Sequence, residues 1–154
     1  MMAKIDFDQI SVHAGPAKSP GFLLWHVSTA WRARIEAALK PLKLTHPQFV
    51  ILATTGWLTK EGEAITQAAI GKMAGLDPNT TSQILKGLEQ RGLVNRVSAL
   101  DARAKQVSVS MTGATLLKRA LPAVEQADED FFHALSKDEN HALLATFQKL
   151  ISFR

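Results

Sequence analysis

The feature that most constrains this chain is a pair of short helices joined by a tight turn. The first helix is predicted over 67–74, with Thr66 as its N-cap and Gly75 after its end. The second begins after Asp77-Pro78 and stops at Gly92. Ser, Thr, Asn and Asp are preferred N-caps, Pro is favoured in the first turn, and Gly is favoured just past the last turn. Two helices with this spacing predict a helix-turn-helix.

The outer face of the second helix is unusual for a solvent-exposed surface. On a helical wheel at ~100° per residue, Thr81, Ile84, Leu85 and Leu88 fall on one side, which we assign to the core. Asn and Gln on the other side offer a donor and an acceptor together, as the adenine edge requires, and Ser and Thr can bond to bases or phosphates. Free N–H groups at a helix start also attract phosphate. The outer face therefore predicts a recognition helix that enters the major groove by its N-terminal turns. Its members are Asn79, Ser82, Gln83, Lys86 and Gln90, with Thr80 at the edge.

The same side chains could instead be only caps and an ordinary solvated face. The segment that follows favours DNA binding. Residues 93–100 and 104–111 are β-prone, and the VSVSM stretch alternates as a strand does. The tip of the resulting hairpin carries Arg103 and Lys105 near Asp101. Because the narrow minor groove attracts an inserted Arg, a protruding hairpin of this kind is an independent indication of a DNA-binding wing.

The distribution of charge supports an anionic partner for the middle of the chain. The net charge is +4. From 64 to 117 there are six Lys or Arg against three acidic residues, whereas from 118 to 139 there are three against six. The basic middle segment is the one that holds the two short helices and the hairpin, so it is the segment expected to meet the anion.

The flanking segments are predicted to be helical. Residues 1–20 form a lead-in with Pro and Gly to which we assign no structure. Residues 21–42 form a long helix whose first turns, FLLWHV, are apolar almost all round, which favours burial against a second chain. A helix from Thr112 to about Leu135 is predicted to be kinked or interrupted at Pro122. A capping box at Ser136 then opens a final helix.

These elements predict a mainly α fold with a small β-hairpin wing, in which the N- and C-terminal helices form a dimerisation body. The predicted division has three parts. Residues 1–20 are the N-terminal lead-in, and 46–111 are the winged helix-turn-helix that binds DNA. Residues 21–45 and 112–154 together form the helical dimerisation region.

Several other classes of protein lack support in the sequence. No apolar run approaches the ~18 residues that cross a bilayer, and the N-terminus has no apolar signal-peptide core, so we expect a cytoplasmic location. The absence of Cys excludes disulfides, thiolate metal sites and thiol redox switches. There is no H-E-x-x-H, G-x-S-x-G, P-loop or Rossmann glycine motif. We therefore predict no enzyme activity, no metal and no cofactor, and interpret His133 and His141 with their acidic neighbours as a solvated helix end.

One group of residues could line a pocket for a small effector. Trp25, His26 and Trp31 on the long helix join Phe49 on the next helix in combining aromatic surface with polar atoms. Arg32 or His26 would then pair with an anionic group of the ligand. The alternative is that these side chains pack in the core of a dimer.

Taken together, three stretches resemble the MarR family of winged-helix transcriptional regulators, over about 21–151. They are LTHPQFVIL (44–52), ITQAAIGKMAGLDPNTTSQILKGLEQRGLVNR (65–96) and DARAKQVSVSMTGA (101–114). The resemblance implies a homodimer whose first and last two helices interleave. It also implies binding to a pseudo-palindromic operator, usually as a repressor. Many members release DNA when a small aromatic or phenolic anion binds between the dimer body and the winged helix.

Matched to the family pattern, the residues of the recognition-helix face are Asn79, Thr80, Ser82, Gln83 and Lys86. Gln67 falls where a phosphate contact is expected, Arg103 matches the wing-tip arginine, and Asp101 matches the acid that steadies it. The chain departs from the pattern at Gln83, where many relatives have Arg, so the base preference does not carry over. The wing also lacks the frequent Pro and a second Arg, and the absence of Cys excludes the branch that senses peroxides.

The leading hypothesis is a ligand-responsive, homodimeric DNA-binding repressor. Asn79 and Gln83 would read bases, Lys86 and Gln67 would hold phosphates, and Arg103 would probe the minor groove, with Lys105 as the second cation of the wing. A winged-helix protein–protein adaptor without an operator is the alternative, since the segment 64–117 has a net charge of only +3. A small hydrolase or metal enzyme has no constellation of residues behind it.

Overall fold

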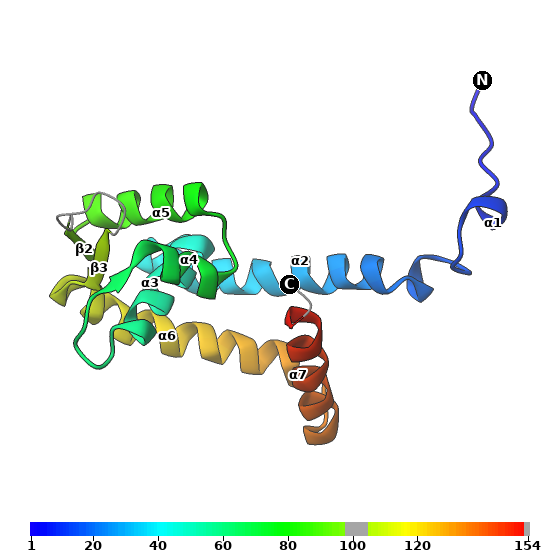
Figure 1. Cartoon of the computed structure of the whole chain (residues 1–154). Coiled ribbons are helices and arrows are strands. Elements are labelled where there is room, and N and C mark those ends of the chain that lie inside the picture. Colours follow the sequence, from blue (N-terminus) through cyan, green and yellow to red (C-terminus); the bar gives the residue numbers. More distant parts are fainter. Residues whose placement is uncertain (98–104, 153–154) are drawn as a thin grey trace.

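The computed structural model describes residues 1–97 and 105–152, and it is mainly helical with a small antiparallel sheet (Figure 1). The predicted fold class, a mainly α winged helix-turn-helix, is confirmed. In chain order, with η for a 3-10 helix, the elements are α1 (Phe7–Ile10), η1 (Pro16–Lys18), α2 (Pro20–Leu39), η2 (Lys40–Leu42), α3 (His46–Leu58), β1 (Ile65–Thr66), α4 (Gln67–Ala74), α5 (Pro78–Gln90), β2 (Val94–Val97), β3 (Gln106–Val109), α6 (Met111–Phe132) and α7 (Lys137–Ile151).

The sheet has three strands in the order β1-β3-β2, and both pairings are antiparallel. The hairpin of β2 and β3 is the predicted wing, with Val94 opposite Val109 at its base. Strand β1 was not predicted, because its two residues directly precede α4 and carry no alternation of their own. It pairs Ile65 with Val107, so the start of α4 is fixed to the wing through the backbone.

The predicted helix starts at Asp77 and Ser136 are confirmed, and α3 begins with a cap of the same kind. Thr45 and Gln48 form a reciprocal capping box at α3, and Ser136 and Glu139 form another at α7. The Asp77 side chain accepts from the amide of Thr80 at the start of α5. Each side chain satisfies backbone N–H groups that have no partner within the helix. These residues therefore set where the helices begin.

The core lies among the helix-turn-helix, the sheet, the end of α2 and the first part of α6. It includes Ile51 and Leu52 from α3, Leu85 and Leu88 from α5, and Val107 from β3, all with no exposed surface. Burial of aliphatic side chains of this size stabilises a fold by roughly 1.5–3 kcal/mol each. The buried face of α5 is thus the predicted one, and its opposite face is left toward solvent.

Helix α6 differs from expectation at two points. It begins after the N-cap Ser110, whose hydroxyl accepts from the amide of Gly113, so the helix starts one residue before Thr112. It then runs unbroken through Pro122, so of the two predicted alternatives, a kink or an interruption, the interruption is wrong. A proline removes one hydrogen bond from the helix ladder. Ala120 and Val124 are buried on either side of it, and we attribute the continuity of the helix to this packing.

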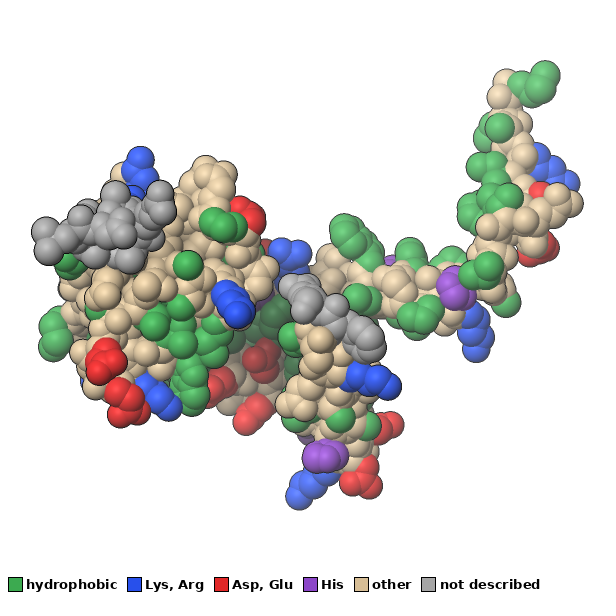
Figure 2. Space-filling view, viewed as in Figure 1, with side chains coloured by type: hydrophobic (Ala, Val, Ile, Leu, Met, Phe, Trp, Pro, Cys, Tyr) green, Lys and Arg blue, Asp and Glu red, His purple; other side chains and the backbone are tan. Residues whose placement is uncertain are grey.

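The two ends of the chain present apolar surface to solvent. Only Ile35 and Leu39 of α2 are buried, and α7 buries no residue. Figure 1 shows α2 extending beyond the winged helix, with α1 and η1, in the segment to which we assigned no structure, at its far end. Figure 2 shows hydrophobic side chains along this projecting part. The exposed large apolar residues of α2 and α7 are Phe22, Leu23, Leu24, Trp25, Val27, Leu144, Phe147, Leu150 and Ile151.

No helix in the described part of the chain is both long enough and apolar enough to cross a membrane.

Candidate nucleic-acid interface

Helix α5 turns its polar face outward, as a recognition helix must. Asn79, Gln83 and Lys86 are exposed, and Ser82 is half-buried. No side-chain atom of these four residues is needed to cap α5, since Asp77 does that. Their donors and acceptors are therefore available to a partner that approaches the N-terminal half of the helix.

Thr80 differs from the other predicted residues on this helix. Its hydroxyl donates to Asp77 Oδ2 over 2.6 Å, and its amide donates to Asp77 Oδ1 over 2.9 Å. The hydrogen bond from the Thr80 side chain, followed by that from its backbone, lowers the pKa of the Asp77 carboxyl below its usual value. Because its hydroxyl proton is committed to this cap, Thr80 is left with acceptor capacity only, and a phosphate contact by its hydroxyl would require breaking the cap.

A hollow of about 540 Å³ lies between the start of α4, the start of α5 and the wing. Lys72 and Lys105 bring two ammonium groups to its wall, and the half-buried Gln67 lies beside them. Lysine and amide donors of this kind contact the phosphates of nucleic acids and fix the orientation of the protein on the duplex. Sequence reasoning selected Gln67 and Lys105 but counted Lys72 only toward the charge of the segment. Lys72 lies four residues after Ala68, which also lines the hollow, so it is on the same face of α4. The other wall residues are Thr66, Ala68, Gly71, Leu76 and Pro78.

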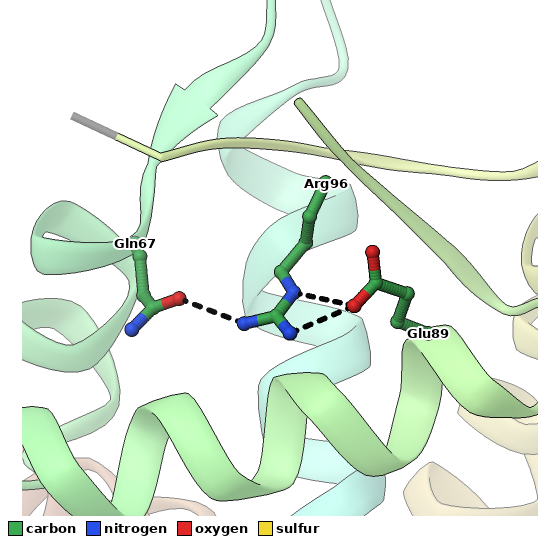
Figure 3. Close-up of polar contacts among 3 residues, drawn as sticks. All are labelled: Gln67, Glu89 and Arg96. Carbon is green, nitrogen blue, oxygen red and sulfur yellow. Dashed lines mark hydrogen bonds and ion pairs between the residues drawn. The ribbon is translucent and has the colours of Figure 1, made fainter. Parts of the chain in front are cut away.

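The side chain of Gln67 is hydrogen-bonded to Arg96, a residue that was not predicted for the site (Figure 3). Arg96 on β2 donates from Nη1 to Gln67 Oε1 over 3.4 Å. The same guanidinium pairs with Glu89 near the end of α5, with Nη2 and Nε lying 2.7 and 2.9 Å from Glu89 Oε2. The opposite charges of Glu89 and Arg96, seven residues apart across the α5–β2 turn, were the signal in the sequence.

The tip of the wing holds two further predicted residues. Asp101 and Arg103 lie outside the described residues. Lys105 is described, and it is exposed immediately before β3. Its backbone carbonyl accepts from the amide of Gln67 over 3.1 Å, which continues the link between the wing and α4.

The residues predicted for an effector pocket are only partly brought together. Trp31 is half-buried, and its indole lies edge-on to the His46 ring, with ring centroids 5.0 Å apart. Phe49 is instead part of the buried core. Trp25 is 69% exposed on the projecting half of α2, and His26 stacks edge-on with Phe22 there. The structure thus leaves Trp25 and His26 on the projecting half of α2, while Trp31 packs against the core to which Phe49 belongs.

A polar cluster remains around Trp31. Its Nε1 donates to Asp128 Oδ1 on α6 over 2.7 Å. The pKa of His46 is lowered chiefly by burial and then by the positive charge of Arg32, with Glu36 and Asp128 opposing the shift. A hollow of about 460 Å³ lies beside His46, and its other lining residues include Lys40 and Lys43. Sequence reasoning selected Trp31 and Arg32 but missed His46 and Asp128, which join them from α3 and α6.

Within 1–97 and 105–152, no three His, Asp or Glu side chains gather as a metal site requires.

Comparison with known proteins places these features in a family. The winged-helix domain model of ArnR1-like proteins matches residues 41–126, which is more than half of the chain. The chain is 34% identical to the uncharacterized HTH-type transcriptional regulator YdcH of Bacillus subtilis, over 92% of this chain and 95% of that protein. It is 28% identical to the HTH-type transcriptional repressor Rv2887 of Mycobacterium tuberculosis, over 84% of this chain and 91% of the other.

Solved structures agree with the fold. CouR from Rhodococcus jostii, bound to p-coumaroyl-CoA, is 25% identical with a TM-score of 0.78, and the match covers 89% of this chain and 94% of CouR. A mutant of MarR from Escherichia coli, complexed with operator DNA, also has a TM-score of 0.78, at 22% identity over 96% of this chain and 99% of that one. The latter likeness shows the fold.

The fold and the sequence matches indicate the same class of protein. The helix-turn-helix and the three-stranded wing sheet are those of a winged-helix regulator, and the matches to such regulators cover most of the chain. This is a family of DNA-binding transcriptional regulators and not a class of enzymes. The chain belongs to the MarR family of winged helix-turn-helix transcriptional regulators.

Proposed function

We propose that this protein is a homodimeric repressor that binds a pseudo-palindromic operator through α5. The observation that carries the proposal is the division of α5 into two faces. Leu85 and Leu88 are buried, whereas Asn79, Gln83 and Lys86 are exposed. Asn79 and Gln83 would read base edges, and Lys86 would contact a phosphate.

Backbone contacts would come from the elements on either side of α5. The hollow between α4 and the wing carries Lys72 and Lys105 next to Gln67, and a DNA strand beside α5 would pass there. Lys105 was predicted as a DNA-binding residue of the wing. Lys72 joins the proposed phosphate contacts because it lines the same hollow. Ser82, half-buried one turn into α5, would donate to the same strand. Arg103 and Asp101 keep the predicted roles at the wing tip, in the minor groove.

The proposed dimer is supported by the apolar surface that one chain leaves uncovered. The first half of α2 and all of α7 expose large hydrophobic side chains. Large exposed apolar patches mark interaction surfaces. We accordingly assign 21–45 and 112–154 to dimerisation and 46–111 to DNA binding. In such a dimer the two α5 helices would enter successive major grooves, with half-sites about one helical turn apart. The MarR relative solved with operator DNA has the same fold.

A titration of duplex DNA at several salt concentrations tests this proposal. Fluorescence anisotropy of a labelled duplex gives the observed association constant, whose logarithm falls linearly with that of the salt concentration when phosphates are contacted. Sedimentation equilibrium of the free protein gives its mass. We expect a dimer and a steep salt dependence. A monomer, or the absence of binding at low salt, would contradict the proposal.

The ligand is a further part of the proposed function. A small aromatic or phenolic anion would bind beside Trp31 and release the operator. The half-buried indole of Trp31, the cation Arg32 and the imidazole of His46 meet where α2, α3 and α6 join. CouR, which shares the fold, was solved with p-coumaroyl-CoA. Trp25 and His26 would line this ligand site only if they came from α2 of the partner. Phe49 would line it only after a shift of the core.

Quenching of tryptophan fluorescence by hydroxybenzoic and hydroxycinnamic acids tests this part. We expect one member of the series to quench at micromolar concentration and to weaken DNA binding by the reciprocal factor that linkage requires. Trp31→Phe should abolish the quenching, while Trp57→Phe, which alters an exposed indole on α3, should retain it. Quenching that persists in Trp31→Phe would place the ligand elsewhere.

A further inference from the structure

We infer that Arg96 is a positioning residue for DNA recognition, which fixes the recognition helix, the wing and the start of α4 in one arrangement by bridging Glu89 and Gln67. The inference rests on the proposed operator binding. It assigns a role in DNA binding to a residue that does not touch DNA and to an acidic residue that DNA would repel.

The bridge joins the three elements that must act together. Glu89 lies in the last turn of α5, Arg96 is on β2 of the wing, and Gln67 is the first residue of α4. One guanidinium contacts both partners, with two nitrogens on the carboxylate and the third on the amide oxygen (Figure 3). Because the fork of a guanidinium is rigid and planar, these contacts restrict the angle between α5 and the wing as well as their separation.

Burial separates Arg96 from the cations that would hold phosphate. Its side chain is 12% exposed, whereas that of Glu89 is 39% exposed. Lys72, Lys86 and Lys105 are exposed, and they are the groups within reach of a DNA backbone. The charge of Arg96 is matched within the protein by Glu89, so it adds little to the net positive charge that DNA meets.

The bridge also determines which end of the Gln67 amide is presented. The oxygen of Gln67 accepts from Arg96, and its nitrogen points away from that guanidinium (Figure 3). A side-chain NH₂ can only donate. Fixed in this way, Gln67 offers a donor toward the hollow shared with Lys72 and Lys105, which suits a phosphate oxygen.

Removal of the charge on Glu89 distinguishes positioning from simple electrostatics. Glu89→Gln deletes a negative charge close to the DNA-binding face, so electrostatics alone predicts tighter binding of every duplex. The bridge predicts the opposite for the operator, because a neutral amide holds Arg96 more weakly. We expect operator affinity to fall about tenfold, while binding to a scrambled duplex stays equal or becomes tighter. The matched control is Glu63→Gln, the same change in an exposed residue of the loop before β1, and it should lower neither affinity.

The experiment uses the full-length dimer and an operator duplex selected from a random pool. Anisotropy titrations compare wild type, Glu89→Gln, Glu63→Gln, Arg96→Lys, Arg96→Gln and the charge-exchanged double variant Glu89→Arg/Arg96→Glu over a range of salt. Circular dichroism spectra and thermal unfolding confirm that each variant is folded. Arg96→Lys keeps the charge but loses the fork, so its operator affinity should also fall about tenfold, with no change in salt slope. The double variant should recover part of the loss if it folds, and Glu89→Gln, which keeps the shape of the side chain, carries the test if it does not.

Two results would overturn the inference. One is operator binding by Glu89→Gln that is unchanged or tighter, together with unchanged binding by Arg96→Lys. The other is a salt slope that falls by about one unit in Arg96→Gln, since that would make Arg96 itself a phosphate ligand. Failure of the proposed function looks different, because wild type would then bind no duplex in preference to the scrambled one.

Discussion

The indole nitrogen of Trp31 donates a 2.7 Å hydrogen bond to Asp128 Oδ1, and this bond joins α2 to α6 across 97 positions of sequence. Trp31 and Asp128 are both half-buried. A bond to a carboxylate is stronger than one between neutral groups, and its removal leaves the indole N–H without its protein partner.

Replacement of Asp128 should therefore lower stability. We expect Asp128→Ala to reduce the free energy of unfolding by about 1–3 kcal/mol, as measured by urea denaturation. Glu129→Ala removes a neighbouring, exposed acid from the same helix and should change the value by less than about 0.5 kcal/mol. If the two substitutions lower the free energy of unfolding equally, the hydrogen bond between Trp31 and Asp128 does not stabilise the fold.

His46 should make stability depend on pH. Burial, followed by the charge of Arg32, lowers its pKa below the usual 6.5, so the unfolded chain takes up the proton first as pH falls. The stabilisation is fully present above about pH 6.5 and is lost progressively between there and the lowered pKa. Wild type should lose more stability than His46→Gln when urea midpoints at pH 7.5 and 5.5 are compared. His141→Gln, an exposed histidine on α7, controls for loss of an imidazole. A pH dependence of His46→Gln equal to that of wild type would contradict this assignment.

Gln83 should govern sequence preference. Gln83→Ala removes a donor–acceptor pair from the exposed face of α5, and we expect discrimination at one base pair per half-site to fall by about 1–3 kcal/mol. Competition titrations with operators substituted at each position would measure it. Intact discrimination at every position would show that α5 is oriented differently on the DNA.

Lys86 should contribute to affinity without regard to sequence. It lies one turn beyond Ser82 and Gln83 on the exposed face. Lys86→Ala should weaken all duplexes uniformly and reduce the salt slope by about one unit for each phosphate that is no longer neutralised. Gln90→Ala, on an exposed residue one turn further along α5, is the uncharged control. A slope that does not change would remove Lys86 from the phosphate contacts.

Gly113 should be intolerant of any side chain. A Cβ at this position would collide with the backbone carbonyl of Leu93 and press on Val109. Gly113→Ala should therefore lower the free energy of unfolding by about 1–3 kcal/mol. Gly87 in α5 has only the distant Gln48 amide, 4.0 Å away, near its ideal Cβ position. Gly87→Ala should therefore stabilise the fold by about 0.5–1 kcal/mol. Thermal unfolding of both variants tests the contrast, and destabilisation by Gly87→Ala would contradict the helix packing described above.

Much of the fold could be predicted because local rules govern it. Thr66, Asp77 and Ser136 are caps in the structure as in the sequence pattern. The apolar positions of α5 are buried as its wheel predicts. Gly113 belongs to the 101–114 stretch that carries the family resemblance, and close packing explains it, because it lies against the Leu93 carbonyl.

The remaining features depend on contacts between distant segments. Strand β1 exists because β3 pairs with it, and two residues carry too little pattern to reveal that. The continuity of α6 through Pro122 depends on tertiary packing that overrides a local breaker. Aromatic character alone groups Phe49 with Trp25 and Trp31, yet α3 turns Phe49 into the core. Asp128 lies 97 positions from Trp31, and only the folded chain reveals the indole as the group it binds.

Selection from a random duplex pool at roughly physiological salt tests most directly whether α5 reads an operator as part of a dimer, because non-specific binding is weak there. We expect enrichment of a palindrome whose half-sites lie about one helical turn apart. We also expect the preference at one base pair per half-site to weaken when Gln83→Ala protein is used. No enrichment, together with no binding at low salt, would contradict the account and favour a winged-helix adaptor that binds another protein.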